Sequence, residues 1–213
     1  MKRWGCLLLC LVILCTGCSK KFTAEDAGQL LRDTYGIEDP EMGWAYDFAY
    51  AEEQTVAGQV YYHFRWSARE EERESFLADL FVAQNGGRIT EARQCPDGSW
   101  TVQSAVSAEE LRRELTLHPY LGEATQQLYI FSDDGAVSLL SEAGGLRGTF
   151  EVYDAEGTLC LDMSIDEQRR VCSCAVWSDG TIVLVDQMQF GWTDSLTVAG
   201  EDTAAQYGGD IVG

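Results

Sequence analysis

The chain has 213 residues, and its 46% share of apolar residues is enough to bury a core and excludes a disordered protein. Its formal net charge is −20, because 35 acidic side chains outnumber 15 basic ones. An acidic surface of this kind repels phosphate backbones, so we do not expect nucleic acid as a partner.

The first 21 residues, MKRWGCLLLCLVILCTGCSKK, have the order of a secretory signal. Lys2 and Arg3 make a basic start, an apolar run follows, and small residues precede Cys18. The apolar span of residues 4–17 is shorter than the about 20 residues that a bilayer-crossing helix needs. The sequence therefore predicts that the rest of the chain is exported.

Residues 14–18, Leu-Cys-Thr-Gly-Cys, resemble the lipobox of bacterial lipoprotein signals, although Cys15 stands where Leu is commoner. The resemblance implies a signal peptide over 1–17 and lipidation of Cys18, which would anchor the protein to the extracytoplasmic side of the cell membrane. An ordinary cleaved signal and an uncleaved apolar anchor are the alternatives. Removal of the two basic residues in the signal leaves 13 basic and 35 acidic side chains, a net charge of −22.

After a short linker over 18–22, residues 23–105 predict an α+β module. Thr23 begins a helix with apolar residues at helical spacing, and Gly36 ends it. The period then changes to two, as aromatic residues alternate with small or polar ones. Strands are expected over 44–51, 59–66, 75–84, 88–94 and 100–102. A helix on one face of an antiparallel meander sheet follows from this order, with the charged residues 69–74 in a solvated loop.

The segments VYYHF over 60–64 and LFVAQNGGRI over 80–89 resemble the small PepSY-like or cystatin-like modules of exported bacterial proteins. The resemblance implies binding or regulation of another protein of the envelope. No residue matches a catalytic motif of these modules. His63 lies among aromatic residues, and we expect a partly exposed sheet-face histidine rather than a functional one.

A helical linker over 106–119 separates this module from the rest of the chain. Ser107 and Glu110 have the spacing of a capping box, and His118 precedes a proline, which disfavours helical backbone. The domain boundary is placed in this linker.

Residues 120–198 alternate short apolar runs with turn residues, often Asp-Gly. Strands are expected over 128–131, 136–140, 149–153, 158–165, 171–177, 181–190 and 195–198. Such evenly spaced strands predict an antiparallel β-meander that closes as a small barrel or sandwich. The glycine run over 144–148 is expected as a loop, and residues 199–213 as a flexible tail.

The phrase GTFEVYD over 148–154, followed by Leu-Cys-Leu over 159–161, resembles the repeated glycine, strand, turn, strand phrase of lipocalin-like lipoprotein domains. The segment LYIF over 128–131 before Asp134 and Gly135 has the same form. The resemblance implies a small barrel, and such a barrel either fills with side chains or holds one small apolar ligand.

Four cysteines, Cys95, Cys160, Cys172 and Cys174, follow the predicted signal. They are expected as buried thiols or as one disulfide, with Cys160 facing Cys172 or Cys174 across a hairpin. No C-x-x-C pair exists and there are only two histidines, so neither a metal site nor a cofactor is expected.

No nucleophile elbow, phosphate loop, zinc-protease or dinucleotide motif occurs in the sequence. The sequence therefore predicts no catalytic residues and a cell-envelope lipoprotein that acts as a non-catalytic binding or interaction module. The proposed partners are the membrane, through Cys18, and another envelope protein. The alternatives are a carrier that holds a small apolar ligand in the β domain, and an enzyme whose site the sequence does not reveal.

Overall fold

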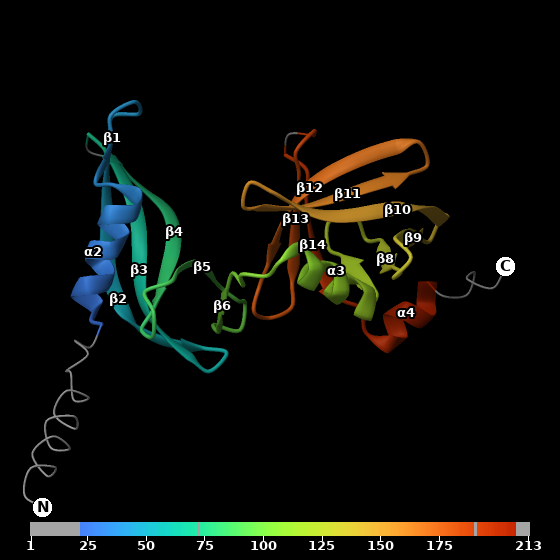
Figure 1. Ribbon diagram of the computed structural model, residues 1–213, viewed down its shortest axis with the longest axis horizontal. Helices are drawn as coiled ribbons and strands as arrows, with labels where there is room; N and C mark the ends of the chain where they lie inside the picture. The colour runs from blue at the N-terminus through green and yellow to red at the C-terminus, as the bar shows by residue number, and fades with distance from the viewer. Residues whose placement is uncertain (1–21, 72, 190, 208–213) are drawn as a thin grey trace, which may run out of the picture. The chain divides into compact units, whose positions relative to one another are not determined.

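The computed structural model describes residues 22–71, 73–189 and 191–207 (Figure 1). These residues form two compact units, of which the first contains the described chain up to Thr55 and Gln59–Ile89. The second contains Val56–Gly58 and the described chain from Thr90 onward. The predicted signal and Cys18 lie outside the described residues. Within those ranges, no helix combines the length and the apolarity that a membrane crossing requires.

The first unit begins with helix α2 (Ala24–Tyr35), which starts with a capping box. Thr23 Oγ1 accepts a hydrogen bond from the Asp26 N–H at 3.2 Å, and the Asp26 carboxylate accepts one from the Thr23 N–H at 3.1 Å. Gly36 ends the helix with a φ of 79°, a backbone conformation that glycine adopts without strain. The helix predicted from Thr23 to Gly36 is therefore confirmed.

The strands of the first unit are β1 (Glu38–Asp39), β2 (Trp44–Val56), β3 (Gln59–Glu70) and β4 (Arg73–Ala83), and they are neighbours in chain order. Helix α2 lies across one face of this sheet (Figure 1). Its buried residues Ala27 and Leu31 share one apolar core with Phe48, Phe64 and Leu80. An α+β arrangement with the helix packed on the sheet is thus present.

The charged residues 69–74 do not form the predicted loop. Arg69 lies opposite Glu74 and Glu70 lies opposite Arg73, so the cluster ends β3 and begins β4. Opposite charges on directly facing strand residues favour pairing, which is why a charged segment can continue a hairpin here.

From Thr90 onward the chain belongs to the second unit. Strand β5 (Ile89–Gln94) pairs with β6 (Trp100–Val102), and helix α3 (Ala108–Leu117) follows. The sequence placed both strands in the first module. The division into compact units falls earlier, between Ile89 and Thr90.

Eight strands then close into a barrel in which each strand pairs antiparallel with the next. They are β7 (Tyr120–Gly122), β8 (Leu128–Phe131), β9 (Ala136–Ser141), β10 (Gly144–Ala155), β11 (Thr158–Ile165), β12 (Gln168–Val176), β13 (Ile182–Asp186) and β14 (Thr193–Val198). Pairing of β14 with β7 completes the circle. Of the two arrangements that the sequence predicted, barrel or sandwich, the structure is a barrel.

Helix α3 closes one end of this barrel. It contacts β8 and β10, and its residues Leu111 and Leu115 join the core that contains Phe131 and Phe150. The Arg112 guanidinium donates a hydrogen bond at 2.9 Å to the Asp133 carbonyl in the turn between β8 and β9. Aliphatic and aromatic side chains fill the barrel at this end. The opposite end, which carries the turn between β11 and β12, is called the barrel mouth below.

Three predicted boundaries in this region are wrong. The glycine run 144–148 begins β10 instead of forming a loop, strand β13 ends at Asp186 instead of residue 190, and Glu201–Tyr207 form a short helix, α4, within the predicted flexible tail. The glycines belong to a strand because neighbouring strands approach closely there. A Cβ at Gly148 would fall against the Ser164 carbonyl oxygen and Ile165.

Replacement of Gly148 by alanine should therefore destabilise the barrel. We expect Gly148→Ala to lower the free energy of unfolding by about 1–3 kcal/mol or more, the usual cost of overpacking. The matched control is Gly200→Ala, because nothing lies near the added methyl group there. Denaturant unfolding measures both, and equal stabilities of the two variants would contradict the close approach at Gly148.

Candidate ligand pocket in the barrel

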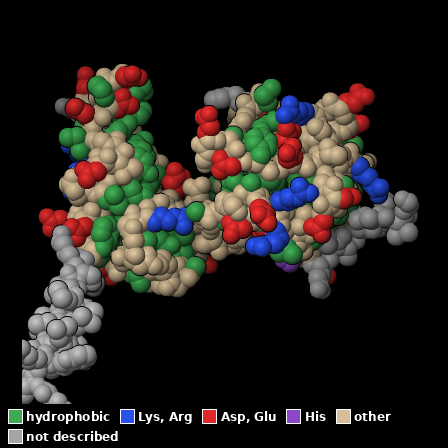
Figure 2. Space-filling model, in the orientation of Figure 1, with side chains coloured by type: hydrophobic (Ala, Val, Ile, Leu, Met, Phe, Trp, Pro, Cys, Tyr) green, Lys and Arg blue, Asp and Glu red, His purple; other side chains and the backbone are tan. Residues whose placement is uncertain are grey.

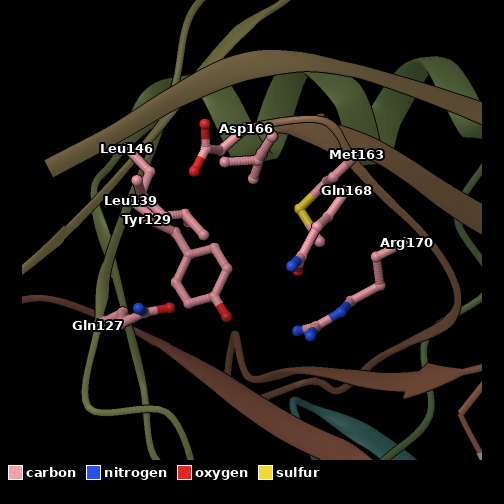
Figure 3. Close-up of a pocket in the computed structure, with 9 residues that line it drawn as sticks. Gln127, Tyr129, Leu139, Leu146, Met163, Asp166, Gln168 and Arg170 are labelled. Atoms are coloured by element: carbon pink, nitrogen blue, oxygen red, sulfur yellow. The ribbon is translucent and has the colours of Figure 1, made fainter.

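A cavity of about 200 Å³ opens at the barrel mouth, at the end of the barrel that carries the turn between β11 and β12 (Figure 3). It is lined by residues of strands β8 to β12, by Gln127 directly before β8 and by Asp166 in the turn between β11 and β12. The apolar lining residues are Leu139, Leu146, Met163 and Ile165, and the polar ones are Gln127, Tyr129, Asp166, Gln168 and Arg170. The two kinds of side chain make the cavity amphipathic.

The alternation of strand residues places these side chains inside the barrel. Leu139 lies directly opposite Leu146, and Met163 lies directly opposite Arg170, so each pair points to the same face of the sheet. Met163 and Tyr129 are buried and form the deep part, whereas Leu146 and Gln168 are exposed at the rim.

Arg170 enters the cavity from β12 and is held on two sides. Its Nε lies 3.2 Å from Oδ2 of Asp186, and its guanidinium carbon lies 4.0 Å from the centroid of the Trp192 ring. The other oxygen of Asp186 accepts hydrogen bonds from the backbone N–H groups of Met188 and Gln189 at 2.7 and 3.0 Å. An ion pair and a cation–π contact together orient the guanidinium.

Tyr129 enters from β8, and its hydroxyl belongs to a buried network around Asp194. The Asp194 side chain accepts four hydrogen bonds, from the N–H groups of Ala124 and Ser195 at 2.8 and 3.0 Å and from the hydroxyls of Thr125 and Tyr129 at 2.7 and 3.2 Å. Burial raises the pKa of Tyr129 above its usual value, so the hydroxyl keeps its proton and donates it to this bond.

Gly122 makes room for the Asp194 network. A Cβ at this position would fall against the Asp194 carboxylate, the Thr125 hydroxyl and the Tyr129 ring. A glycine on β7 is therefore a condition for the buried carboxylate on β14, which β7 faces in the closed barrel.

Loss of the Asp194 carboxylate should weaken the barrel strongly. Asp194 is 1% exposed, and Asp194→Ala leaves four donors without their acceptor, so we expect a loss of about 2–4 kcal/mol in the free energy of unfolding. Glu123→Ala removes an exposed carboxylate from the turn between β7 and β8, and it should change the free energy of unfolding by less than about 0.5 kcal/mol. Thermal unfolding of the two variants gives the comparison, and a mild effect of Asp194→Ala would contradict the network.

The four cysteines of the described chain are free thiols, and no disulfide joins them. Cys172 and Cys174 share the interior face of β12, as the spacing predicted, and burial raises the pKa of Cys172 to about 12 and also raises that of Cys174. Cys160 lies opposite Ser173. It therefore points to the other face of the sheet, and the predicted pairing of Cys160 with Cys172 or Cys174 is wrong.

His63 is 4% exposed, so the prediction of a partly exposed histidine is wrong. Its Nε2 lies 2.7 Å from Oδ1 of Asp79 on the neighbouring strand. His118 is exposed at the end of α3, and neither histidine lines the barrel cavity. Among the described residues, no group of three or more His, Cys, Asp or Glu side chains is placed to hold a metal ion.

The sequence did not single out Arg170, Asp186 or Asp194. A signal for the two aspartates exists, because Asp186 lies two residues after the interior Leu184 and Asp194 lies two residues before the interior Leu196. Charged side chains in the interior phase of a strand are rare in a core that only needs to be filled. Only the register of the closed barrel shows which of them meet.

Comparison with known proteins gives no relative: no protein-family model, curated protein or solved structure matches the chain. The barrel is lipocalin-like in general shape, since eight antiparallel strands in chain order close on themselves. The role of the chain must therefore be inferred from the geometry of the cavity.

Proposed function

We propose that this chain is a non-catalytic, lipid-anchored binding protein of the cell envelope whose barrel holds a small amphiphilic molecule. The observation that carries the proposal is the amphipathic cavity at the barrel mouth, whose wall combines leucine, isoleucine and methionine side chains with a guanidinium and a hydroxyl. Small-molecule sites are usually concave, and placed polar groups in them orient the ligand. Five of the nine residues that line this cavity are polar, so a ligand that fits it has a polar group as well as an apolar part.

The cavity volume limits the ligand to a small molecule. An apolar cavity of about 150 Å³ holds benzene. The cavity of about 200 Å³ therefore suits a molecule of roughly eight to ten non-hydrogen atoms. A long acyl chain would not fit inside without extending past the rim.

The polar groups of the cavity favour binding over catalysis. Asp186 and Asp194 are occupied by an ion pair and hydrogen bonds, and no histidine lines the cavity. General acid–base catalysis needs a group with a pKa near the working pH at the reacting atoms. Arg170 and Tyr129 do not provide one, since arginine stays protonated and burial raises the pKa of the tyrosine. The remaining carboxylate, that of Asp166, is exposed at the rim.

Cys18→Ser should release the protein from the membrane. Two or more acyl chains anchor a protein stably, at about 0.8 kcal/mol for each buried CH₂ group, and serine offers no thiol for the thioether link. Cys95→Ser, which exchanges a cysteine outside the predicted signal, is the control and should leave the protein with the membrane. Fractionation of the native host checks both variants, and persistence of the Cys18→Ser protein in the membrane fraction would rule out the lipid anchor.

Leu146→Trp should fill the cavity and weaken ligand binding. With 1-hexanol as the probe, we expect the dissociation constant to rise about tenfold or more, because the indole takes the space of the alkyl chain. Val185→Trp is the matched control. Val185 is 44% exposed and Leu146 is 43% exposed, but Val185 points out of the barrel.

The measurement is a titration that follows ¹H–¹⁵N shifts of the barrel amides. The proposal requires that 1-hexanol shifts amides of the cavity in the unsubstituted chain and that, of the two variants, only Leu146→Trp raises the dissociation constant measured from these shifts. An equal effect of both variants, or no shift at any concentration up to the solubility limit, would overturn it.

An envelope protein partner for the first unit is also proposed from the sequence. The exposed Phe76 on β4 is consistent with it, with the Arg65 guanidinium 5.4 Å from the centroid of its ring. Single exposed aromatic rings are common on protein surfaces, so Phe76 alone does not identify a binding surface for such a partner.

Acidic side chains are scattered over the visible face of each unit (Figure 2).

A further inference from the structure

We infer that the barrel mouth selects a neutral carbonyl compound, such as a primary carboxamide with a short alkyl chain, over the carboxylate and the ammonium ion of the same length. This inference rests on the proposed function, since it names the ligand class of the same cavity. It follows from which hydrogen-bonding groups of the cavity are free to bind and how its charges balance.

Arg170 provides the donors. Its Nε faces Asp186 and its plane lies against Trp192, and within the described part of the chain no hydrogen bond from its two Nη groups is found. Figure 3 shows the guanidinium extending toward the space beside the Tyr129 hydroxyl. A carbonyl oxygen placed there would accept from an oriented donor that is already desolvated on two sides.

The charge of Arg170 is already balanced. Asp186 pairs with it and has a side chain that is only 5% exposed. Asp194 is a second buried carboxylate, linked to the cavity through the Tyr129 hydroxyl, and Asp166 adds a third at the rim. A bound carboxylate would be the fourth negative charge in or beside a cavity lined by one guanidinium, in a chain of net charge −20. Like charges this close disfavour the ionised ligand.

A cation fits no better. The oxygens of Asp186 and Asp194 are occupied by Arg170, backbone N–H groups and hydroxyls, so a bound ammonium would compete with existing partners. It would also lie next to the guanidinium of Arg170. Of the remaining acceptors, the Asp166 carboxylate is exposed at the rim, where water screens its attraction for a cation. The amide oxygens of Gln127 and Gln168 are neutral and suit the N–H groups of a carboxamide.

The apolar side chains of the cavity set the rest of the ligand. Leu139 lies directly opposite Tyr129 on the neighbouring strand, and Met163 lies directly opposite Arg170, so an alkyl chain next to the polar groups meets apolar side chains as well. Since the cavity suits roughly eight to ten non-hydrogen atoms, a carboxamide with a chain of about six carbons including the carbonyl fits the space. Hexanamide is therefore a suitable probe, and hexanoate has the same number of non-hydrogen atoms.

The test compares hexanamide, hexanoate and hexylammonium at pH 7 on the ¹⁵N-labelled full-length chain, with 1-hexanol as the reference. We expect shifts at the same cavity amides and a dissociation constant for hexanamide at least about tenfold below those of hexanoate and hexylammonium. Hexanamide should also bind more tightly than 1-hexanol, because its carbonyl accepts from Arg170 while its two N–H groups donate to Gln127 and Gln168, whereas a hydroxyl has one donor.

A conservative variant tests the role of the guanidinium. Arg170→Lys keeps the charge beside Asp186 but loses the planar fork, so its affinity for hexanamide should fall about fivefold or more. Arg169→Lys is the matched control. Arg169 is the exposed neighbour that pairs with Asp162 on the outer face of the barrel, and its substitution should leave the affinity unchanged.

Three outcomes distinguish the inference about the ligand class from the proposed binding function of the barrel. Tightest binding of hexanamide, reduced by Arg170→Lys alone, supports the neutral carbonyl class. Binding of hexanoate or hexylammonium as tight as that of hexanamide, or equal effects of the two lysine variants, overturns the ligand class while the binding function stands. Failure of all four probes to shift the cavity amides overturns both.

Discussion

Closure of the barrel by the pairing of β14 with β7 is the contact on which the candidate site depends. Leu196 faces Gly122 in this pairing, and the missing side chain of Gly122 leaves room for the Asp194 carboxylate. Asp194 then reaches the hydroxyls of Thr125 and Tyr129. Without closure, the carboxylate would have no buried partners and Tyr129 would lose the bond that holds its hydroxyl.

Burial of the polar groups at the barrel mouth costs folding free energy. Because packing of the barrel does not require these groups, they indicate a role other than filling the interior. A buried ion pair such as that of Arg170 with Asp186 contributes little net stability, because desolvation offsets the attraction between the charges. Apolar residues at these positions would fill the barrel equally well. At the closed end, where Leu111 and Leu115 of α3 meet Phe131 and Phe150, the interior is apolar. One end of the barrel is thus a packed apolar core, whereas the other end has a cavity with polar side chains, which is the candidate site.

Local sequence signals predicted those features whose cause is also local. The capping boxes at Thr23 and Ser107 begin helices in the structure, because both partners of each box lie within three residues. Alternation of apolar and polar residues predicted most strands, but not the strand character of the glycine run 144–148. That run belongs to a strand because β11 approaches it closely, and such an approach leaves no mark in the run itself.

The sequence by itself determined an acidic, core-forming chain, a helix on a strand-rich first module and an antiparallel meander in the second. Each of these follows from composition or from a period of two or 3.6 residues, which any short segment displays. Only the tertiary structure decided that the meander closes, that Cys160 lies on the face opposite Cys172, and that Arg170 meets Asp186 and Trp192. Register between strands decides these contacts, and a shift of one residue would turn every one of these side chains to the other face.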